Sequence, residues 1–426
     1  MGLFDFLRRI FFGSPPSQSQ SVSPVESTPV PEESSPRQPR TKTKLEPLRY
    51  SSRHASRVEN IEEVSSPPYE LARYGARTGH YFDMTRDGDA EKLARNELPQ
   101  FSTPVELAEW LNIPLGKLAW LTHRFTQFDR PDEEQESHYI YHWKPKRSGF
   151  RLIESPRPFL KMAQQQILQE ILNQIPLHSA AHGFVQGRSS VTNAAPHTGK
   201  RVVVKFDLEN FYTSVKFSRV VAIFRNLGYC REASLYLARL TTSVIPMSLP
   251  FPDGSLRPLI PYLSRHLPQG APTSPALANL SAYSLDVRLS GLARAFDADY
   301  TRYADDLTFS GSEQFLRSLR VFLPLVNQII KSERFQVNQM KRRVLRDNQQ
   351  QKVTGVVVNE HPNVPRKEFD LLKAILTNCI RQGPATQNRE NHPDFASHLR
   401  GRVAYVQQLN PNRGQRLLQL YEQIRW

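Results

Sequence analysis

The sequence predicts an α+β fold in which strands and amphipathic helices follow one another along the chain. The segment RVVVKFD at 201–207 has four apolar residues among its seven and is typical of a buried strand. The segment 299–310 contains two β-rich runs around a tight turn, which predicts a hairpin. Apolar residues recur at helical spacing in 158–175 and 276–293, which predicts two core helices, the second packed under the sheet.

Three carboxylates stand at the ends of these predicted strands. Asp305 and Asp306 occupy the predicted hairpin turn, where Asn-Gly or Asp-Gly would suit a tight turn better and where neighbouring anions repel. Asp207 ends the buried strand, so a sheet that contains both segments would bring the three carboxylates together. Such a cluster can hold two metal ions about 4 Å apart, and hard oxygen ligands favour Mg²⁺. For the hairpin pair alone, a solvated turn is the alternative.

Charge and cysteine content narrow the class of partner. The 426-residue chain has a formal charge of +15 and a pI near 9.8, which favours nucleic acid over membrane as the partner. Its length suits two or three subdomains. Because Cys230 and Cys379 are far apart and lack metal-ligand spacing, we expect no disulfide or zinc site and a cytoplasmic protein. No apolar run approaches the ~18 residues of a membrane span, so we expect no transmembrane segment.

Three motifs in a fixed order resemble the palm of a reverse transcriptase. They are FDLENFY at 206–212, LPQGAPTSP at 267–275 and YADD at 303–306. The resemblance implies a right-hand polymerase fold with fingers, palm and thumb, and RNA-templated DNA synthesis with Mg²⁺. It also implies that Asp207 and Asp305 bridge the metals, that Asp306 supports them and that the carbonyl of Leu208 completes the ligand set.

Two further motifs resemble those of bacterial retron reverse transcriptases. N-A-x-x-H runs from Asn193 to His197, shortly before the strand that ends in Asp207, and V-T-G occupies 353–355 after the palm. Without the family, Asn193 and His197 would be interpreted as structural polar groups with satisfied hydrogen bonds. Because generic polymerase chemistry requires neither motif, the two together favour the retron type.

A hairpin predicted over 138–156 corresponds to the fingers of the family. Its strands alternate about a turn at 146–149, and cationic side chains crowd this small element. Arg151 matches the family's G-x-R-x-I-x-x-P pattern, and the resemblance makes it the clamp for the incoming triphosphate. For Lys146 and Arg147, a plain surface role is the alternative.

The resemblance assigns three more residues to the nucleotide. Tyr212 matches the steric gate, whose ring leaves no room for a 2′-hydroxyl, whereas Phe211 is expected to fill the core. Gln269 touches the sugar, and Gly270 lets the backbone approach the template and nucleotide closely. Lys341 matches, more loosely, a lysine near the leaving pyrophosphate.

The chain divides into four predicted regions. Residues 1–60 form a disordered Pro/Ser-rich tail with a short amphipathic segment at 1–12. Residues 61–135 form a helical N-terminal module, and residues 136–358 form the fingers and palm. Residues 359–426 form a basic helical thumb.

The N-terminal module contains a segment, 102–121, that resembles a helix-turn-helix. A DNA-reading role is one interpretation. A packing role is favoured because Leu118, Trp120 and Leu121 leave the second helix few polar side chains to reach base edges.

The C-terminal region is the most basic part of the chain. From 341 to 426 it contains 15 Lys and Arg against 7 acidic residues. Helical patterns at 368–380 and 395–409 suit a thumb that lies along a nucleic-acid duplex. We therefore predict RNA binding by Arg400, Arg402 and Arg413, with a role in solubility alone as the alternative.

The retron resemblance implies a specific activity. Such an enzyme copies part of a structured noncoding RNA into single-stranded DNA, leaves a branched RNA-DNA product and acts in defence against phage. The implied partners are that RNA as template and primer, dNTPs, the DNA product and an effector protein. The alternatives are another bacterial reverse transcriptase, intron-like or of the abortive-infection type, and a noncatalytic nucleic-acid-binding protein on a polymerase fold. The last would tolerate loss of the carboxylates, yet all three are present.

Overall fold

The computed structural model describes residues 61–124, 129–146 and 149–426. The predictions for the tail at 1–60, its amphipathic start included, and for Arg147 lie outside the described residues. Among the helices that the structure describes, none has the length and apolar character needed to cross a membrane.

A four-stranded antiparallel sheet forms the palm. Its strands are β6 (Val202–Asp207), β7 (Ala298–Tyr303), β8 (Asp306–Gly311) and β9 (Arg343–Arg346), in the order β7-β8-β6-β9. The predicted strand and hairpin are therefore neighbours, and Asp207 pairs directly with Asp306. The α+β prediction is confirmed.

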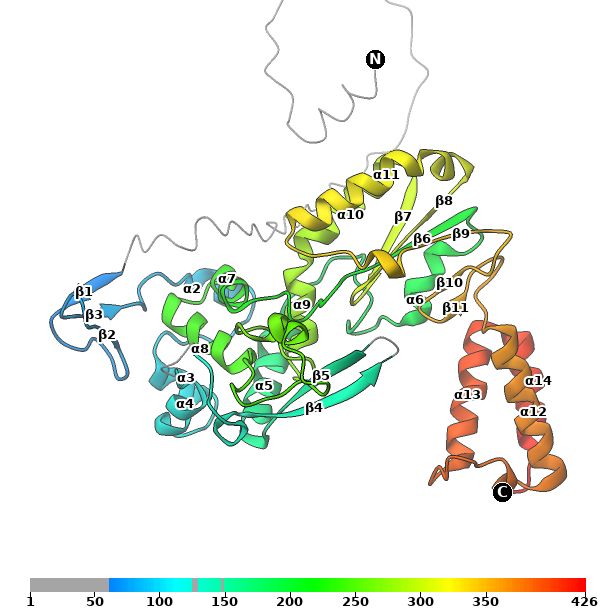
Figure 1. Ribbon diagram of the computed structural model, residues 1–426, viewed down its shortest axis with the longest axis horizontal. Coiled ribbons are helices and arrows are strands. Elements are labelled where there is room, and N and C mark those ends of the chain that lie inside the picture. Colours follow the sequence, from blue (N-terminus) through cyan, green and yellow to red (C-terminus); the bar gives the residue numbers. More distant parts are fainter. Residues whose placement is uncertain (1–60, 125–128, 147–148) are drawn as a thin grey trace, which may run out of the picture. The chain divides into compact units, whose positions relative to one another are not determined.

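Helices cover the palm sheet (Figure 1). They are α9 (Ser274–Ser281), α10 (Tyr283–Ala295) and α11 (Glu313–Ser332). The ring of Phe309 on β8 lies 5.1 Å from that of Phe322 on α11, in an edge-on contact within the core. The single helix predicted at 276–293 is interrupted at Ala282, where one helix ends and the next begins.

The fingers consist of a long hairpin and the helices around it. The hairpin is formed by β4 (Tyr139–Lys146) and β5 (Gly149–Pro156), as predicted. The helices are α5 (Pro158–Glu170), α7 (Phe217–Leu227) and α8 (Arg231–Thr241). The short helix α6 (Ser190–Ala194) lies instead beside β7 and the later strands β10 (Lys352–Val353) and β11 (Val356–Val357) (Figure 1). The helix expected at 158–175 ends at Glu170 and is followed by a short 3₁₀ turn.

The N-terminal module is not wholly helical, so that prediction is wrong for its first part. There β1 (Glu62–Val64), β2 (Arg73–Gly75) and β3 (His80–Asp83) form an antiparallel sheet in the order β1-β3-β2. The helices α2 (Ala90–Arg95), α3 (Pro104–Trp110) and α4 (Leu115–Leu121) follow. In the segment that resembles a helix-turn-helix, Leu107 and Leu118 are fully buried and Trp110 donates a 2.9 Å hydrogen bond to Glu170 of α5. These contacts support the packing role.

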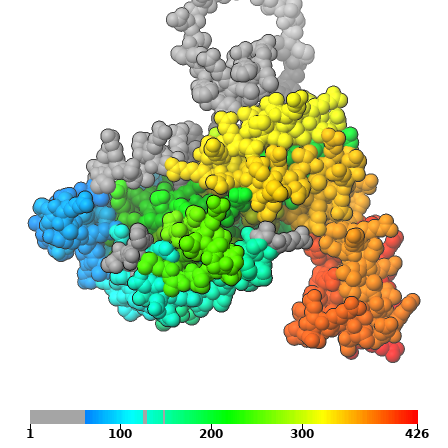
Figure 2. Space-filling view, in the orientation of Figure 1, coloured from blue at the N-terminus to red at the C-terminus, as the bar shows by residue number. Residues whose placement is uncertain are grey.

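The thumb follows a short hairpin formed by β10 (Lys352–Val353) and β11 (Val356–Val357). It contains α12 (Arg366–Gln382), α13 (Phe395–Leu409) and α14 (Pro411–Glu422), seen as orange and red surfaces in Figure 2. The third helix was not predicted, although Asn410 caps it and Pro411 occupies its first turn. The three helices contribute Leu372, Leu399 and Leu417 to one hydrophobic core, which also contains the valines of the β10–β11 hairpin.

Candidate active site

The catalytic hairpin, by which we mean β7, β8 and the turn between them, holds two of the three carboxylates. Because Tyr303 pairs with Asp306, the turn consists of Ala304 and Asp305, and Asp306 is the first residue of β8. The prediction that Asp305 and Asp306 share the turn is therefore wrong by one residue. Ala304 adopts a positive φ of 55°, a conformation that the tight turn requires. Asp207 and Asp306 are directly opposite in neighbouring strands, so their side chains share one face of the sheet.

The three carboxylates are close enough to perturb one another. Burial, and then the charges of Asp306 and Asp207, raise the pKa of Asp305 to about 6. Burial also raises the pKa of Asp306, and the charge of Asp207 acts in the same direction. Ionisation of this cluster is thus opposed unless cations approach it.

A lysine supplies one such cation. The Nζ of Lys341 donates hydrogen bonds of 2.9 Å to both carboxylate oxygens of Asp207. Within the described residues, no three His, Cys, Asp or Glu side chains are arranged to hold a metal ion as they stand. The chemistry of the three carboxylates nevertheless fits a hard divalent cation. The ammonium of Lys341 occupies one lone pair on each oxygen of Asp207, so it competes with a cation for that carboxylate. The side chain of Lys341 is 57% exposed.

All seven residues predicted for catalysis and nucleotide binding line one cavity of about 500 Å³. They come from β5, β6, the catalytic hairpin, two loops and a short 3₁₀ helix, and they are Arg151, Asp207, Tyr212, Gln269, Asp305, Asp306 and Lys341. A cavity of this size accommodates a nucleotide.

The predicted gate tyrosine and its neighbour have different environments. Phe211 is buried, and its ring lies 5.7 Å from that of Phe335 in the core. Tyr212 is half-buried at the cavity wall, where burial and the charge of Asp305 raise its pKa to about 12. The predicted division between a core ring and a cavity ring agrees with these positions.

The Gln269–Gly270 loop is fixed by the fingers. The backbone N–H of Glu154 on β5 donates a 2.9 Å hydrogen bond to the carbonyl of Gln269. Gly270 has a φ of 136°, and a Cβ there would lie 2.9 Å from the carbonyl oxygen of Glu154. Within the protein, the close approach of this glycine is therefore to β5. Its expected approach to the nucleotide and template stays a prediction.

Sequence reasoning missed Arg302, which holds the turn from within. Its fully buried guanidinium makes two hydrogen bonds, of 2.8 and 2.6 Å, to the carboxylate of Asp286. It also donates to the side-chain oxygen of Asn279 and to the carbonyl of Ala304 in the turn. A lone arginine in the strand YTRY was the available signal, because a charge on a buried strand requires a partner.

Phe184 was also missed. It lines the cavity, is largely exposed and has a positive φ of 59°. An aromatic residue in the glycine-broken loop 181–189 was the signal.

The three arginines predicted to bind RNA do not form one surface. Arg413 packs its guanidinium 5.1 Å from the ring centre of Phe369 and donates a 3.2 Å hydrogen bond to Asn363, within the thumb. Arg402 lines a groove of about 320 Å³ between α12 and α13, beside His398 and Tyr405. Arg400 is exposed, and two residues along an α-helix are about 200° apart, so it points away from Arg402.

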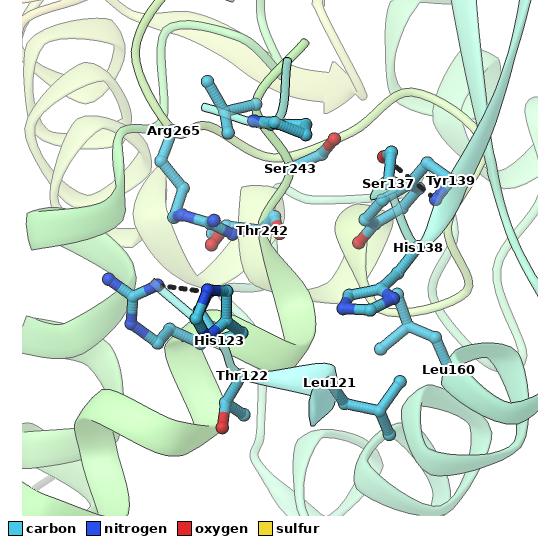
Figure 3. Close-up of a pocket in the computed structure, with 13 residues that line it drawn as sticks. Leu121, Thr122, His123, Ser137, His138, Tyr139, Leu160, Thr242, Ser243 and Arg265 are labelled. Atoms are coloured by element: carbon cyan, nitrogen blue, oxygen red, sulfur yellow. Dashed lines mark hydrogen bonds between the residues drawn. The ribbon is translucent and has the colours of Figure 1, made fainter. Parts of the chain in front are cut away.

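A second cavity lies where the N-terminal module meets the fingers. Figure 3 shows its lining, to which Ser137, His138, Ser243 and Arg265 contribute. Its volume of about 20 Å³ has room for one water molecule and not for a nucleotide. None of the predicted site residues lines it, so it belongs to the packing between the two parts.

Comparison with known proteins gives matches over most of the chain. The family model described as reverse transcriptase (RNA-dependent DNA polymerase) matches residues 143–358. The retron Mx65 reverse transcriptase of Myxococcus xanthus is 41% identical over 332 residues, which are 77% of this chain and 73% of that protein. The retron Mx162 reverse transcriptase of the same organism is 36% identical over 344 residues, 77% of this chain and 68% of that protein. Among solved structures, the telomerase of Candida albicans has a TM-score of 0.40 and 12% identity, over 67% of this chain and 63% of that one.

Proposed function

Because the chain belongs to the retron reverse transcriptases, which are RNA-directed DNA polymerases, we propose that it copies part of a structured noncoding RNA into single-stranded DNA by two-metal nucleotidyl transfer. The main support is the carboxylate cluster, in which Asp207 pairs with Asp306 and the charges of all three aspartates act on one another. A cluster whose ionisation is opposed, at the base of a nucleotide-sized cavity, suits a site that is completed by cations.

Asp207, Asp305, Asp306 and the carbonyl of Leu208 would hold Mg²⁺. The bound ions would activate the attacking hydroxyl and neutralise charge on the transferred phosphoryl group. The protein's own part is to position the reactants, which contributes much of the rate in phosphoryl transfer.

Each remaining cavity residue has a proposed part. Arg151 binds the triphosphate through its guanidinium, and Tyr212 packs under the sugar and excludes a 2′-hydroxyl. Gln269, held by its backbone contact with β5, orients the sugar. Lys341, once released from Asp207, stabilises the leaving pyrophosphate by its charge or by donating a proton.

The further properties of the retron family are part of the proposal. They are a branched RNA-DNA product primed within the noncoding RNA, a role in defence against phage and an effector protein as partner. We also propose that synthesis takes place in the cytoplasm, since both cysteines are free thiols.

Replacing Asp305 by Asn tests the assignment. The substitution removes one charge from the cluster and keeps the shape, so extension of a primer on an RNA template with dNTPs and Mg²⁺ should fall about 100- to 1000-fold. Asp297→Asn is the matched control, because Asp297 is an exposed carboxylate just before β7 and does not line the cavity. Near-normal extension by the Asp305 variant would overturn the proposal.

A further inference from the structure

The two motifs typical of retron enzymes are parts of one buried network. Its first element is His197, which is fully buried behind the catalytic hairpin. Its Nδ1 lies 2.6 Å from the hydroxyl of Ser310 on β8, and its Nε2 lies 2.8 Å from the hydroxyl of Thr301 on β7. One imidazole thus bridges both strands of the hairpin that carries Asp305.

The hydrogen bonds determine which nitrogen of His197 carries the proton. Thr301 donates its single hydroxyl hydrogen to the carbonyl of Asn193, at 3.2 Å, so its oxygen must accept from Nε2–H of His197. Nδ1 then accepts from the hydroxyl of Ser310. Burial lowers the pKa of His197 to about 4, which agrees with a neutral ring at pH 7.

Asn193 connects this network to the second motif. Its side-chain nitrogen lies 3.4 Å from the hydroxyl of Thr354, which donates a 3.0 Å hydrogen bond to the carbonyl of Ser190 on α6. Thr354 and Gly355 form the turn between β10 and β11, and both have positive φ, as a tight hairpin turn requires. The V-T-G motif is thus a turn whose hydroxyl is bound to α6.

The same turn leads into the thumb. Val353 and Val356, on either side of it, share a hydrophobic core with Ala194 of the first motif. Leu372 of α12 and Val403 of α13 belong to that core as well. A continuous series of buried contacts therefore runs from the catalytic hairpin through both motifs to the base of the thumb.

We propose that Asn193, His197 and Thr354 form a joint that fixes the catalytic hairpin relative to the base of the thumb, and that they are positioning residues without contact to nucleic acid. Asn193 and His197 are fully buried, so a base or phosphate does not reach them. If the thumb holds the primer-template duplex, this joint determines the position of the primer end relative to Asp305. The inference rests on the proposed catalytic role of that hairpin.

Thr354→Val tests the joint with little change of shape. Valine keeps the β-branch at this positive φ but removes the hydroxyl that contacts Asn193 and Ser190. We expect kcat for single-nucleotide extension to fall about tenfold or more, with the KM for dNTP and the Kd for a primer-template duplex changed by less than about twofold. Thr241→Val is the matched control: it removes a buried hydroxyl that bonds only within α8 of the fingers, and kcat should be retained.

Two results would overturn the inference. A weaker Kd with unchanged kcat would mean that Thr354 contacts nucleic acid. A lower unfolding temperature with unchanged kcat, measured well below that temperature, would mean that the network only stabilises the fold.

A double-mutant cycle keeps the test decisive. His197→Gln retains an N–H donor, so it should keep more activity than His197→Leu, which retains none. Because His197 and Thr354 belong to one connection, the double variant His197→Gln with Thr354→Val should lose less than the product of the two single losses. Fully multiplicative losses would show that the two motifs act separately. Failure of the proposed function would appear elsewhere, as retained activity of Asp305→Asn.

Discussion

Asp305 and Asp207 stand in opposite electrostatic environments although both belong to one cluster. Burial, and then two neighbouring anions, oppose the ionisation of Asp305, whereas the ammonium of Lys341 pairs with both oxygens of Asp207. The protein without metal therefore has one carboxylate that is costly to ionise and one that is already neutralised. A bound metal ion would make Asp305 easier to ionise, and it would compete with Lys341 for the carboxylate of Asp207.

The raised pKa of Asp305 predicts how stability changes with pH in the absence of metal. Its pKa of about 6 in the folded protein lies above the ordinary 3.8, so the folded state binds the proton more tightly than the unfolded state does. The free energy of unfolding should then fall as the pH rises from about 4 through about 6. Asparagine does not ionise, so Asp305→Asn should not show this decrease in the free energy of unfolding. Above pH 6 the variant should be more stable than the unsubstituted protein by about 1 to 3 kcal/mol, and near pH 4 it should have no advantage.

Urea unfolding in EDTA at pH 4.5 and pH 7.5, with Asp297→Asn as control, measures this difference. Addition of Mg²⁺ should reduce the stability advantage of Asp305→Asn at pH 7.5, because the unsubstituted protein is then stabilised by a cation that the variant binds weakly. An equal difference at both pH values would show that ionisation of Asp305 is not opposed in the folded state.

Residues whose type indicates their chemistry could be identified from the sequence, but their tertiary contacts could not. Asp207, Asp305 and Asp306 follow predicted strands, and each lines the cavity. The contact between Lys341 and Asp207 joins residues 134 positions apart, and Arg302 reaches Asp286 on a helix. Contacts of this kind depend on tertiary packing, which no local pattern determines.

At the level of elements, the catalytic hairpin depends on the loop that passes behind it. The N–H of His182 donates a 2.7 Å hydrogen bond to the carbonyl of Arg302, so this loop extends the edge of the sheet beside β7. Gly183 follows, and a Cβ there would lie 2.6 Å from the backbone nitrogen of Ala304. The absence of a side chain at 183 allows the turn that carries Asp305 to close.

Gly183→Ala should therefore displace the turn. We expect a loss of about 1 to 3 kcal/mol in the free energy of unfolding and of about tenfold or more in kcat, because the added methyl group meets backbone and not a flexible side chain. Gly291→Ala is the control, since Gly291 lies in α10 with open space around its Cβ position, and it should be neutral or slightly stabilising. Equal behaviour of the two variants in urea unfolding and primer extension would contradict the proposed role of Gly183.

Elements with strong periodicity were predictable, and those with weak signals were not. The β4–β5 hairpin and α12 and α13 match their patterns closely. The strands β1 to β3 have three or four residues each and only Asp83 among them is buried, so they are too short and too little buried for a clear alternation of apolar and polar residues. They form because they pair with one another, which is a nonlocal contribution.

For the whole molecule, net charge indicated the class of partner but not the surface that meets it. Five of the 15 basic residues from 341 onward come before the thumb, in the segment 341–352. Within the thumb, the structure separates the three arginines chosen from the sequence. Arg402 beside His398 and Tyr405 combines a cation with rings in one groove, an arrangement that suits unpaired nucleotides of a folded RNA. Arg413 contacts Phe369 and Asn363 within the thumb.

This separation predicts different outcomes for three single substitutions. Arg402→Gln should weaken binding of the cognate structured RNA, reduce the slope of log K against log salt by about one and lower branched product more than extension of a DNA primer annealed to a generic RNA. Arg400→Gln is the control on the opposite side of α13. It should reduce the slope of log K against log salt by no more than Arg402→Gln does, and it should lower branched product and generic primer extension equally. Arg413→Gln should lower the unfolding temperature first, because it loses its contacts with Phe369 and Asn363.

The measurement is a paired assay of each variant, with debranching-sensitive product from the cognate RNA on one side and generic primer extension on the other. A shape-specific contribution to RNA binding resists salt, whereas contacts with phosphates alone do not, so both assays are run at low and at high salt. If Arg402→Gln lowers the two products equally at both salt concentrations, the groove binds duplex without specificity for the cognate RNA. Recognition of the noncoding RNA would then have to come from another surface, and the N-terminal module, with its exposed Trp120 beside Lys117, would be the next to test.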